Sequence, residues 1–135
     1  SNHSSRPFRR AYKFGLPSIF IKSYHEWMEA PKGWTWSDKI IVDKTLYIHG
    51  TEFSGQNGAA QAAMRHRMST AIGHIHSHGG VQYLNGIGGQ IFGLNAGCLI
   101  DFESYAFKYA KGFPNHPTLG CGVVIDGKEA FFIPM

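Results

Sequence analysis

The order of apolar runs in the middle of the chain most constrains its fold. Residues 40–42 and 46–49 are short runs rich in β-branched and aromatic side chains, and each predicts a strand. The alanine-rich segment 56–67 predicts a helix, because alanine is the best helix former, and residues 70–75 predict the next strand. This strand–helix–strand order indicates an α/β fold with a sheet that carries functional groups at its strand ends.

The C-terminal segment "GCGVVIDGKEAFFIPM" carries the clearest local signal. Two β-branched or aromatic runs flank Asp126-Gly127, and this pair is typical of a type I′ turn. A β-hairpin is therefore expected at the end of the chain. The glycine-rich passage 79–89 leads into "QIFGLNAG", which predicts another strand and turn.

The N-terminal part has helical character. Residues 5–14 predict a basic helix, and a second, amphipathic helix is expected to begin at an N-cap, Ser18, and to end before Pro31. Residues 34–36 predict a short strand. The helical spacing of that second helix is carried by Phe20, Tyr24, Trp27 and Met28. Since the chain has no internal repeat and no low-complexity linker, residues 1–135 are interpreted as a single domain.

Composition narrows the class of protein. Hydrophobic residues make up 43% of the chain and charged residues 16%, so a packed core is expected rather than disorder. The net charge of +4 fits an anionic partner. Cys98 and Cys121, with no C-x-x-C spacing, indicate two buried thiols in a reducing compartment, with a disulfide as the alternative. No apolar run approaches the roughly 20 residues of a membrane helix, so we expect a soluble, cytoplasmic protein without a membrane partner.

A cluster of histidines within "TAIGHIHSHGG" suggests a metal site. Along an extended backbone His74 and His76 project to the same side, and neutral imidazole is a common metal ligand. Gly73 and Gly79-Gly80 would let the backbone turn closely around such a site. His49 ends the separate strand "TLYIHG", where α/β proteins place functional residues. His78 shares the parity of the pair but lies past the expected strand end, so it is a ligand or a supporting residue.

The strings "HG" at 49–50, "GHIH" at 73–76 and "LNAGC" at 94–98 occur in an informative order. In this order they resemble the C-terminal half of calcineurin-like metallophosphoesterases, whose motifs include H-G followed by G-H-x-H. The initial "SNHSSR" resembles a degraded form of that family's G-N-H-D/E motif. The resemblance implies a partial metallophosphoesterase β-sandwich, a mixed sheet with flanking helices, and hydrolysis of a phosphomonoester or phosphodiester.

The resemblance also implies roles for individual residues. Asn2, His49 and His74 would bind one metal ion, His76 would bind a second, and His3 would assist departure of the leaving group. The ions would be Mn, Fe, Zn or Ni, which imidazole suits about equally. Further residues are expected to support the ligands or to contact the phosphate: His78 and Asn95 for the first role, and Arg6, Arg65 and Arg67 for the second.

The D-x-H and G-D-x-x-D motifs of that family are absent from the chain. Without a bridging carboxylate, neutral ligands face dications with little charge compensation, so this chain alone should bind metal weakly and at one site at most. We therefore expect a fragment or half-enzyme whose partner is a complementing N-terminal half. An uncovered sheet edge would also favour a homo-oligomer.

Two other functions remain open at this point. His49, His74 and His76 could share one zinc ion in a mononuclear hydrolase. Alternatively, the chain could be a nucleic-acid-binding module, because basic residues are interleaved with aromatic ones and this mixture suits single strands. The residues of that surface would be Arg6, Arg9, Arg10, Lys13, Arg65 and Arg67, with Phe8, Tyr12 and Phe14.

Overall fold

The computed structural model describes residues 2–101 and 116–135, with residues 2–4 described by their backbone alone. The chain divides into two compact units, Ser1–Asp38 and Lys39–Met135, where the sequence suggested one domain. None of the helices in the described part has the length and apolar character needed to cross a membrane.

The N-terminal unit contains three short helical segments. They are α1 (Asn2–Lys13), the 3₁₀ helix η1 (Ser18–Phe20) and α2 (Tyr24–Trp27). The helix predicted over 5–14 is confirmed by α1. The prediction of one amphipathic helix from Ser18 is wrong. The chain is extended at Ile21, and α2, which follows, is only four residues long.

A capping box explains where α2 begins. The Ser23 hydroxyl accepts a hydrogen bond from the Glu26 N–H (3.3 Å), and the Glu26 carboxylate accepts one from the Ser23 N–H (2.7 Å). The Ser23 hydroxyl also donates to this carboxylate (2.7 Å), and this bond, followed by the bond from the Ser23 N–H, holds the pKa of Glu26 below its usual value. The strand predicted at 34–36 is absent from the described structure; there the Trp36 ring packs edge-on against Tyr24 and His25.

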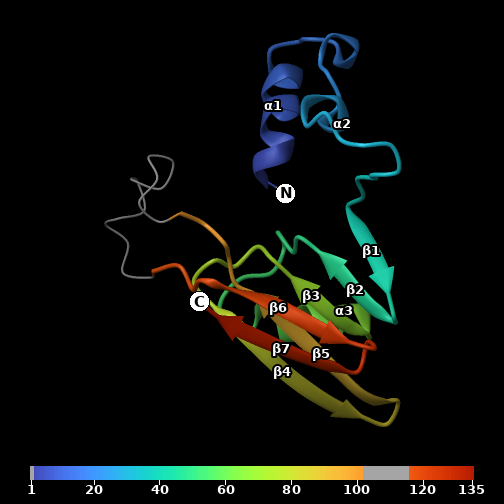
Figure 1. Cartoon of the computed structure of the whole chain (residues 1–135), viewed down its shortest axis with the longest axis vertical. Coiled ribbons are helices and arrows are strands. Elements are labelled where there is room, and N and C mark those ends of the chain that lie inside the picture. Colours follow the sequence, from blue (N-terminus) through green and yellow to red (C-terminus); the bar gives the residue numbers. More distant parts are fainter. Residues whose placement is uncertain (1, 102–115) are drawn as a thin grey trace. The chain divides into compact units, whose positions relative to one another are not determined.

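A mixed five-stranded sheet forms the centre of the C-terminal unit (Figure 1). Its spatial order is β1-β2-β3-β5-β4, with β2, β3 and β5 parallel and the edge strands β1 and β4 antiparallel to their neighbours. The bounds are β1 Lys39–Val42, β2 Thr45–Ile48, β3 Ser69–Ile72, β4 Gly79–Gly86 and β5 Gly89–Ala96. The expected mixed α/β architecture is confirmed, and β4 is a strand that the glycine-rich sequence did not predict.

Helix α3 (Gly58–His66) covers one face of this sheet. Two of its buried alanines share one apolar cluster with side chains of the sheet and the adjoining loops: Ala59, Ala62, Phe53, Ile72 and Ile75. The helix lies so close to β5 that a Cβ atom at Gly93 would overlap the backbone of Ala59 and Ala60. The small side chains of α3 and the bare backbone at Gly93 therefore set how near the helix approaches the sheet.

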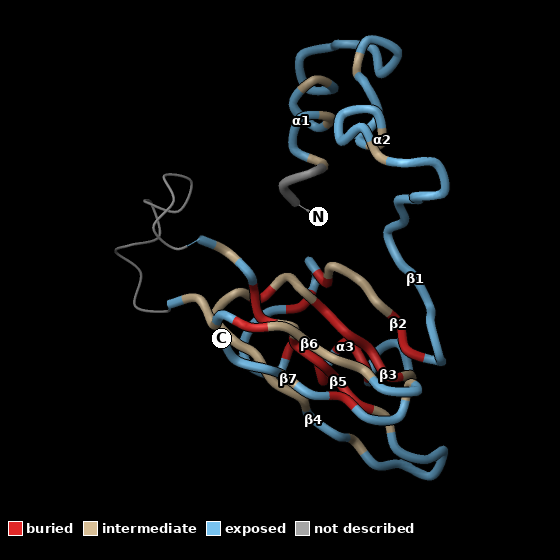
Figure 2. The backbone as a smooth tube through the Cα atoms, viewed as in Figure 1, coloured by how far each residue is buried: buried red, intermediate tan, exposed pale blue. Residues whose placement is uncertain are grey.

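A hairpin of β6 (Gly120–Ile125) and β7 (Glu129–Pro134) covers the opposite face. Asp126 and Gly127 both have positive φ, 51° and 64°, which confirms the predicted type I′ turn. The Tyr83 hydroxyl donates to the Ala130 carbonyl (3.2 Å) and accepts from the Ala130 N–H (2.9 Å), so it joins β4 to β7. Figure 2 shows buried residues concentrated in the middle strands β3 and β5 and in helix α3.

One edge of the sheet is open to solvent. All four residues of β1 are exposed, and Ile40, Ile41 and Val42 are the β-branched side chains among them. Exposed apolar edge strands promote pairing with other chains. The homo-oligomer stays a prediction, and β1 is the edge on which it would depend.

Gly93→Ala should destabilise the C-terminal unit by about 1–3 kcal/mol, because α3 must move away from β5 to admit a methyl group. Urea unfolding followed by circular dichroism measures this change. Gly86→Ala in the same β4–β5 hairpin is the control, since its Cβ would meet no atom within 4 Å and the expected change is below about 0.5 kcal/mol. Equal stabilities for both variants would contradict the close helix–sheet contact.

Candidate metal centre

Parallel pairing of β2 with β3 positions the first two candidate ligands. Ile48 pairs with Ile72 at the carboxyl ends of these strands, so the segments that follow β2 and β3 leave the sheet at the same end of the strands. His49 follows β2 directly, and the Gly73 N–H donates a hydrogen bond to the His49 carbonyl (3.3 Å). This bond continues the ladder by one step and brings His74 beside His49.

Glycine is required at the turn after His49. Gly50 has φ +85°, and a Cβ atom there would lie 2.9 Å from the Ile72 side chain. Gly73, by contrast, has open space around it and no positive φ, so the close turn expected at this residue is not found. The backbone beside the histidines is therefore shaped by Gly50 after β2 rather than by Gly73 after β3.

The two imidazoles converge. His74 Nδ1 and His49 Nε2 are 3.3 Å apart, the ring centroids are 5.1 Å apart, and the ring planes meet at 71°. Both residues are half-buried. Two nitrogens that each lie about 2.0–2.1 Å from one ion at a tetrahedral angle are separated by roughly 3.3–3.4 Å. The observed spacing thus fits two neighbouring ligands of one ion, as well as a hydrogen bond between the rings.

The loop that carries His76 is fixed from two sides. Ile75 is buried in the cluster beneath α3, while its neighbours His74 and His76 remain half-buried. The His76 carbonyl accepts hydrogen bonds from the Thr118 N–H (2.7 Å) and from Cys98 Sγ (3.7 Å). Burial raises the pKa of the Cys98 thiol, so it stays a protonated donor. Cys98 is therefore a structural thiol, and neither it nor Cys121 is in a disulfide.

Further ligands are limited in the described part of the chain. Among the side chains that the structure describes, those of residues 5–101 and 116–135, no three His, Cys, Asp or Glu residues are arranged to hold one ion. Asp43 and Asp126 line a cavity at the opposite ends of the parallel strands, where β2, β3 and β5 begin. The described part of the C-terminal unit therefore brings one histidine pair together at the carboxyl ends of the parallel strands. The carboxylates of Asp43 and Asp126 lie at the opposite ends of these strands.

The supporting residues predicted from the sequence lie near the same edge. Asn95 pairs with Ile72 near the end of β5 and is 3% exposed. His78 Nδ1 is 2.9 Å from the Ser77 hydroxyl oxygen. The side chains of Asn2 and His3 lie outside the described residues, so their assignments stay predictions.

The arginines expected to contact phosphate lie on two different helices. Arg6 is exposed on α1 in the N-terminal unit. The Arg65 guanidinium lies over the Phe53 ring, 5.8 Å from its centroid. Arg67 caps the C-terminal end of α3 and lines the cavity at the edge where the parallel strands begin. This placement separates Arg67 from the histidine pair and does not support its predicted contact with a phosphate there.

Comparisons of the chain with protein-family models, with curated proteins and with solved structures found no match. The site is therefore interpreted from its own geometry. The sequence reasoning missed the role of the Cys98 thiol and of the Thr118 backbone, because both act through the His76 carbonyl, and backbone groups leave no signal in a sequence.

Substituting either His49 or His74 with alanine should weaken zinc binding by about tenfold or more, because one of the two converging imidazoles is lost. Isothermal titration with Zn²⁺ measures the affinity. His66→Ala is the matched control, since His66 is exposed at the end of α3 and contacts the Phe53 ring. The pairing would be refuted if the three variants bound zinc equally well.

Proposed function

We propose that this chain contributes half of the active site of a metal-dependent phosphoesterase that hydrolyses a phosphomonoester or phosphodiester. The observation that supports this proposal is the approach of His74 Nδ1 to His49 Nε2 at the carboxyl ends of two parallel strands. These are the residues of the H-G and G-H-x-H strings that resemble the calcineurin-like metallophosphoesterases. In that resemblance both histidines serve the same ion, and here their rings converge.

In this proposal the chain's residues hold and orient the site. His49 and His74 present ring nitrogens to one point, and both rings must be neutral to act as ligands. The proton that joins the two rings in the metal-free pair must move to the far nitrogen of its ring, so ligation requires a change of tautomer. His76, on a loop anchored through its carbonyl, would serve the second ion. When bound, divalent ions polarise the phosphoryl oxygens and activate a water.

The remaining parts of the site would come from elsewhere. In the proposal Asn2 completes the first ion's ligands and His3 assists the leaving group. A complementing half would supply the carboxylates of the D-x-H and G-D-x-x-D motifs, whose charge would compensate the two ions. The five-stranded sheet with its hairpin layer would then be one side of a β-sandwich.

Complementation tests this function. The chain should hydrolyse bis(p-nitrophenyl) phosphate in the presence of Mn²⁺ only when combined with a segment that supplies the two aspartate motifs. In the combined protein, His76→Ala should reduce kcat by about a hundredfold or more, because the second ion loses a ligand, whereas His66→Ala should leave kcat unchanged. Metal-independent hydrolysis, or a His76→Ala variant with full activity, would contradict the proposal.

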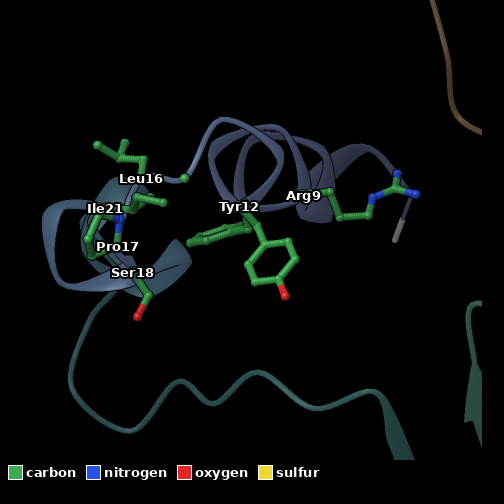
Figure 3. Close-up of a pocket in the computed structure, with 8 residues that line it drawn as sticks. Arg9, Tyr12, Leu16, Pro17, Ser18 and Ile21 are labelled. Carbon is green, nitrogen blue, oxygen red and sulfur yellow. The ribbon is translucent and has the colours of Figure 1, made fainter.

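A groove in the N-terminal unit favours nucleic-acid binding as a second candidate function. A cavity of about 710 Å³ borders α1, and Arg9 and Tyr12 are among its lining residues. Figure 3 shows Arg9 and Tyr12 projecting from α1, with Leu16 and Ile21 on the segment that follows. Tyr12 is 87% exposed and Phe14 81%, so their rings are accessible for stacking on bases beside a cationic side chain.

Tyr12→Ala should weaken binding to a random single-stranded oligonucleotide about fivefold or more at low salt, because base stacking on the ring is lost. Fluorescence anisotropy measures the affinity. Ile19→Ala removes an equally exposed apolar side chain (85%) that cannot stack in this way, and serves as the control. No binding by the unmodified chain at low salt would dismiss this second function.

A further inference from the structure

A polar cavity of about 240 Å³ lies on the helix-covered face of the sheet, between the first turn of α3 and strands β4 and β5. It exists because two residues on that face lack side chains. Gly80 pairs with Asn95 across β4 and β5, and a Cβ atom at Gly80 would meet nothing within 4 Å. Gly93 lets the backbone of Ala59 lie directly on β5, which brings the start of α3 near Asn95.

Asn95 carries a buried hydrogen-bond donor without an acceptor. The residue is 3% exposed and lines the cavity. Its Oδ1 accepts from the Gly97 N–H (3.4 Å), which identifies the other amide atom as Nδ2, and Nδ2 has no partner among the described residues. Asn95 is in register with Ile72, whose side chain packs beneath α3, so both face the helix. A buried amide donor left in this way is costly and favours a ligand acceptor.

The helix end beside Asn95 presents further donors. The first N–H groups of a helix have no intrahelical acceptor; at the start of α3 the Gly58 N–H donates to the Gly55 carbonyl (3.1 Å), and no acidic side chain lies in the first turn. The N-cap Asn57 makes no side-chain cap, because its Oδ1 accepts from Gln82 Nε2 (2.9 Å) instead. The positive end of the helix dipole therefore meets a cavity whose described lining contains no carboxylate.

We propose that this cavity is an oxyanion subsite that takes a phosphate group, held by Asn95 Nδ2 and by N–H groups of the first turn of α3, with His78 at its rim. Backbone amides at a helix start and a side-chain amide are donors, so the site selects an acceptor-rich anion and needs no metal ion. The inference goes beyond the proposed hydrolysis and does not depend on metal binding by His49 and His74. If both sites operate, the substrate carries a phosphate besides the ester that is cleaved.

The test uses the full chain, isotope-labelled and free of metal, with inorganic phosphate as the probe. Titration at constant ionic strength should shift the Asn95 side-chain NH₂ resonances and the backbone amide of Ala59 with a common affinity. Sodium chloride at the same ionic strength should leave them in place. Unshifted Asn95 and Ala59 resonances in this unmodified chain would overturn the proposal without recourse to any variant.

Variants then test the donor itself. Asn95→Asp replaces Nδ2 by an anionic oxygen, and Asn95→Leu replaces the amide by an apolar group of similar volume, so each should weaken phosphate binding about tenfold or more. Asn85→Asp, on the exposed part of β4, is the control and should bind phosphate as the unmodified chain does. Unchanged phosphate affinity in a folded Asn95→Leu variant would overturn the assignment. Because the chain is metal-free throughout, failure here leaves the zinc and hydrolysis experiments to decide the proposed function separately.

Discussion

The parallel pairing of β2 with β3 is the constraint on which the candidate site depends. It aligns Ile48 with Ile72, and the hydrogen bond from the Gly73 N–H to the His49 carbonyl extends that alignment past the strand ends. Two histidines 25 residues apart in sequence thereby place ring nitrogens 3.3 Å apart. The helix between the strands makes this possible, because parallel strands need a crossover connection and α3 supplies it.

The two ends of the parallel strands carry different groups. The carboxyl ends of β2, β3 and β5 carry three features: the histidine pair, the start of α3 and the buried amide of Asn95. At the amino ends, the turn at Asp43 and Lys44 has two positive φ values and packs against Gly127 of the hairpin turn. The histidine pair and the Asn95 amide thus lie at the carboxyl ends of the parallel strands, where open α/β sheets place their ligands.

Local sequence signals predicted those parts of the fold that local physics decides. The alanine-rich helix, the strands around Ile41 and Tyr47, and the Asp126-Gly127 turn follow from propensity and turn chemistry, and all are present. Strand β4 was missed because its glycines give no strand signal, and its pairing with β5 and the Tyr83–Ala130 hydrogen bonds stabilise it instead. The start of α2 was predictable, since Ser23 and Glu26 have capping-box spacing.

The candidate site was predictable only in part, because local signals do not report the long-range pairing and packing that position some of its residues. The strand predicted over 70–75 ends at Ile72, so His74 and His76 lie in the segment that follows β3, and their i, i+2 spacing is not that of a strand. The orphan amide of Asn95 depends on the register of β5 with β3 and on the close approach of α3 at Gly93, and neither can be deduced from one sequence. The wide separation of Arg67 from the pair likewise depends on the direction of α3.

The most direct measurement for the histidine pair is the nitrogen chemical shifts of the histidine rings during a zinc titration. If the rings share one ion, His49 Nε2 and His74 Nδ1 will move together to the values of ligated nitrogens and reach saturation at the same zinc concentration. Ligation of one ring without the other, or separate saturation of the two, would contradict a shared ion at the ends of β2 and β3.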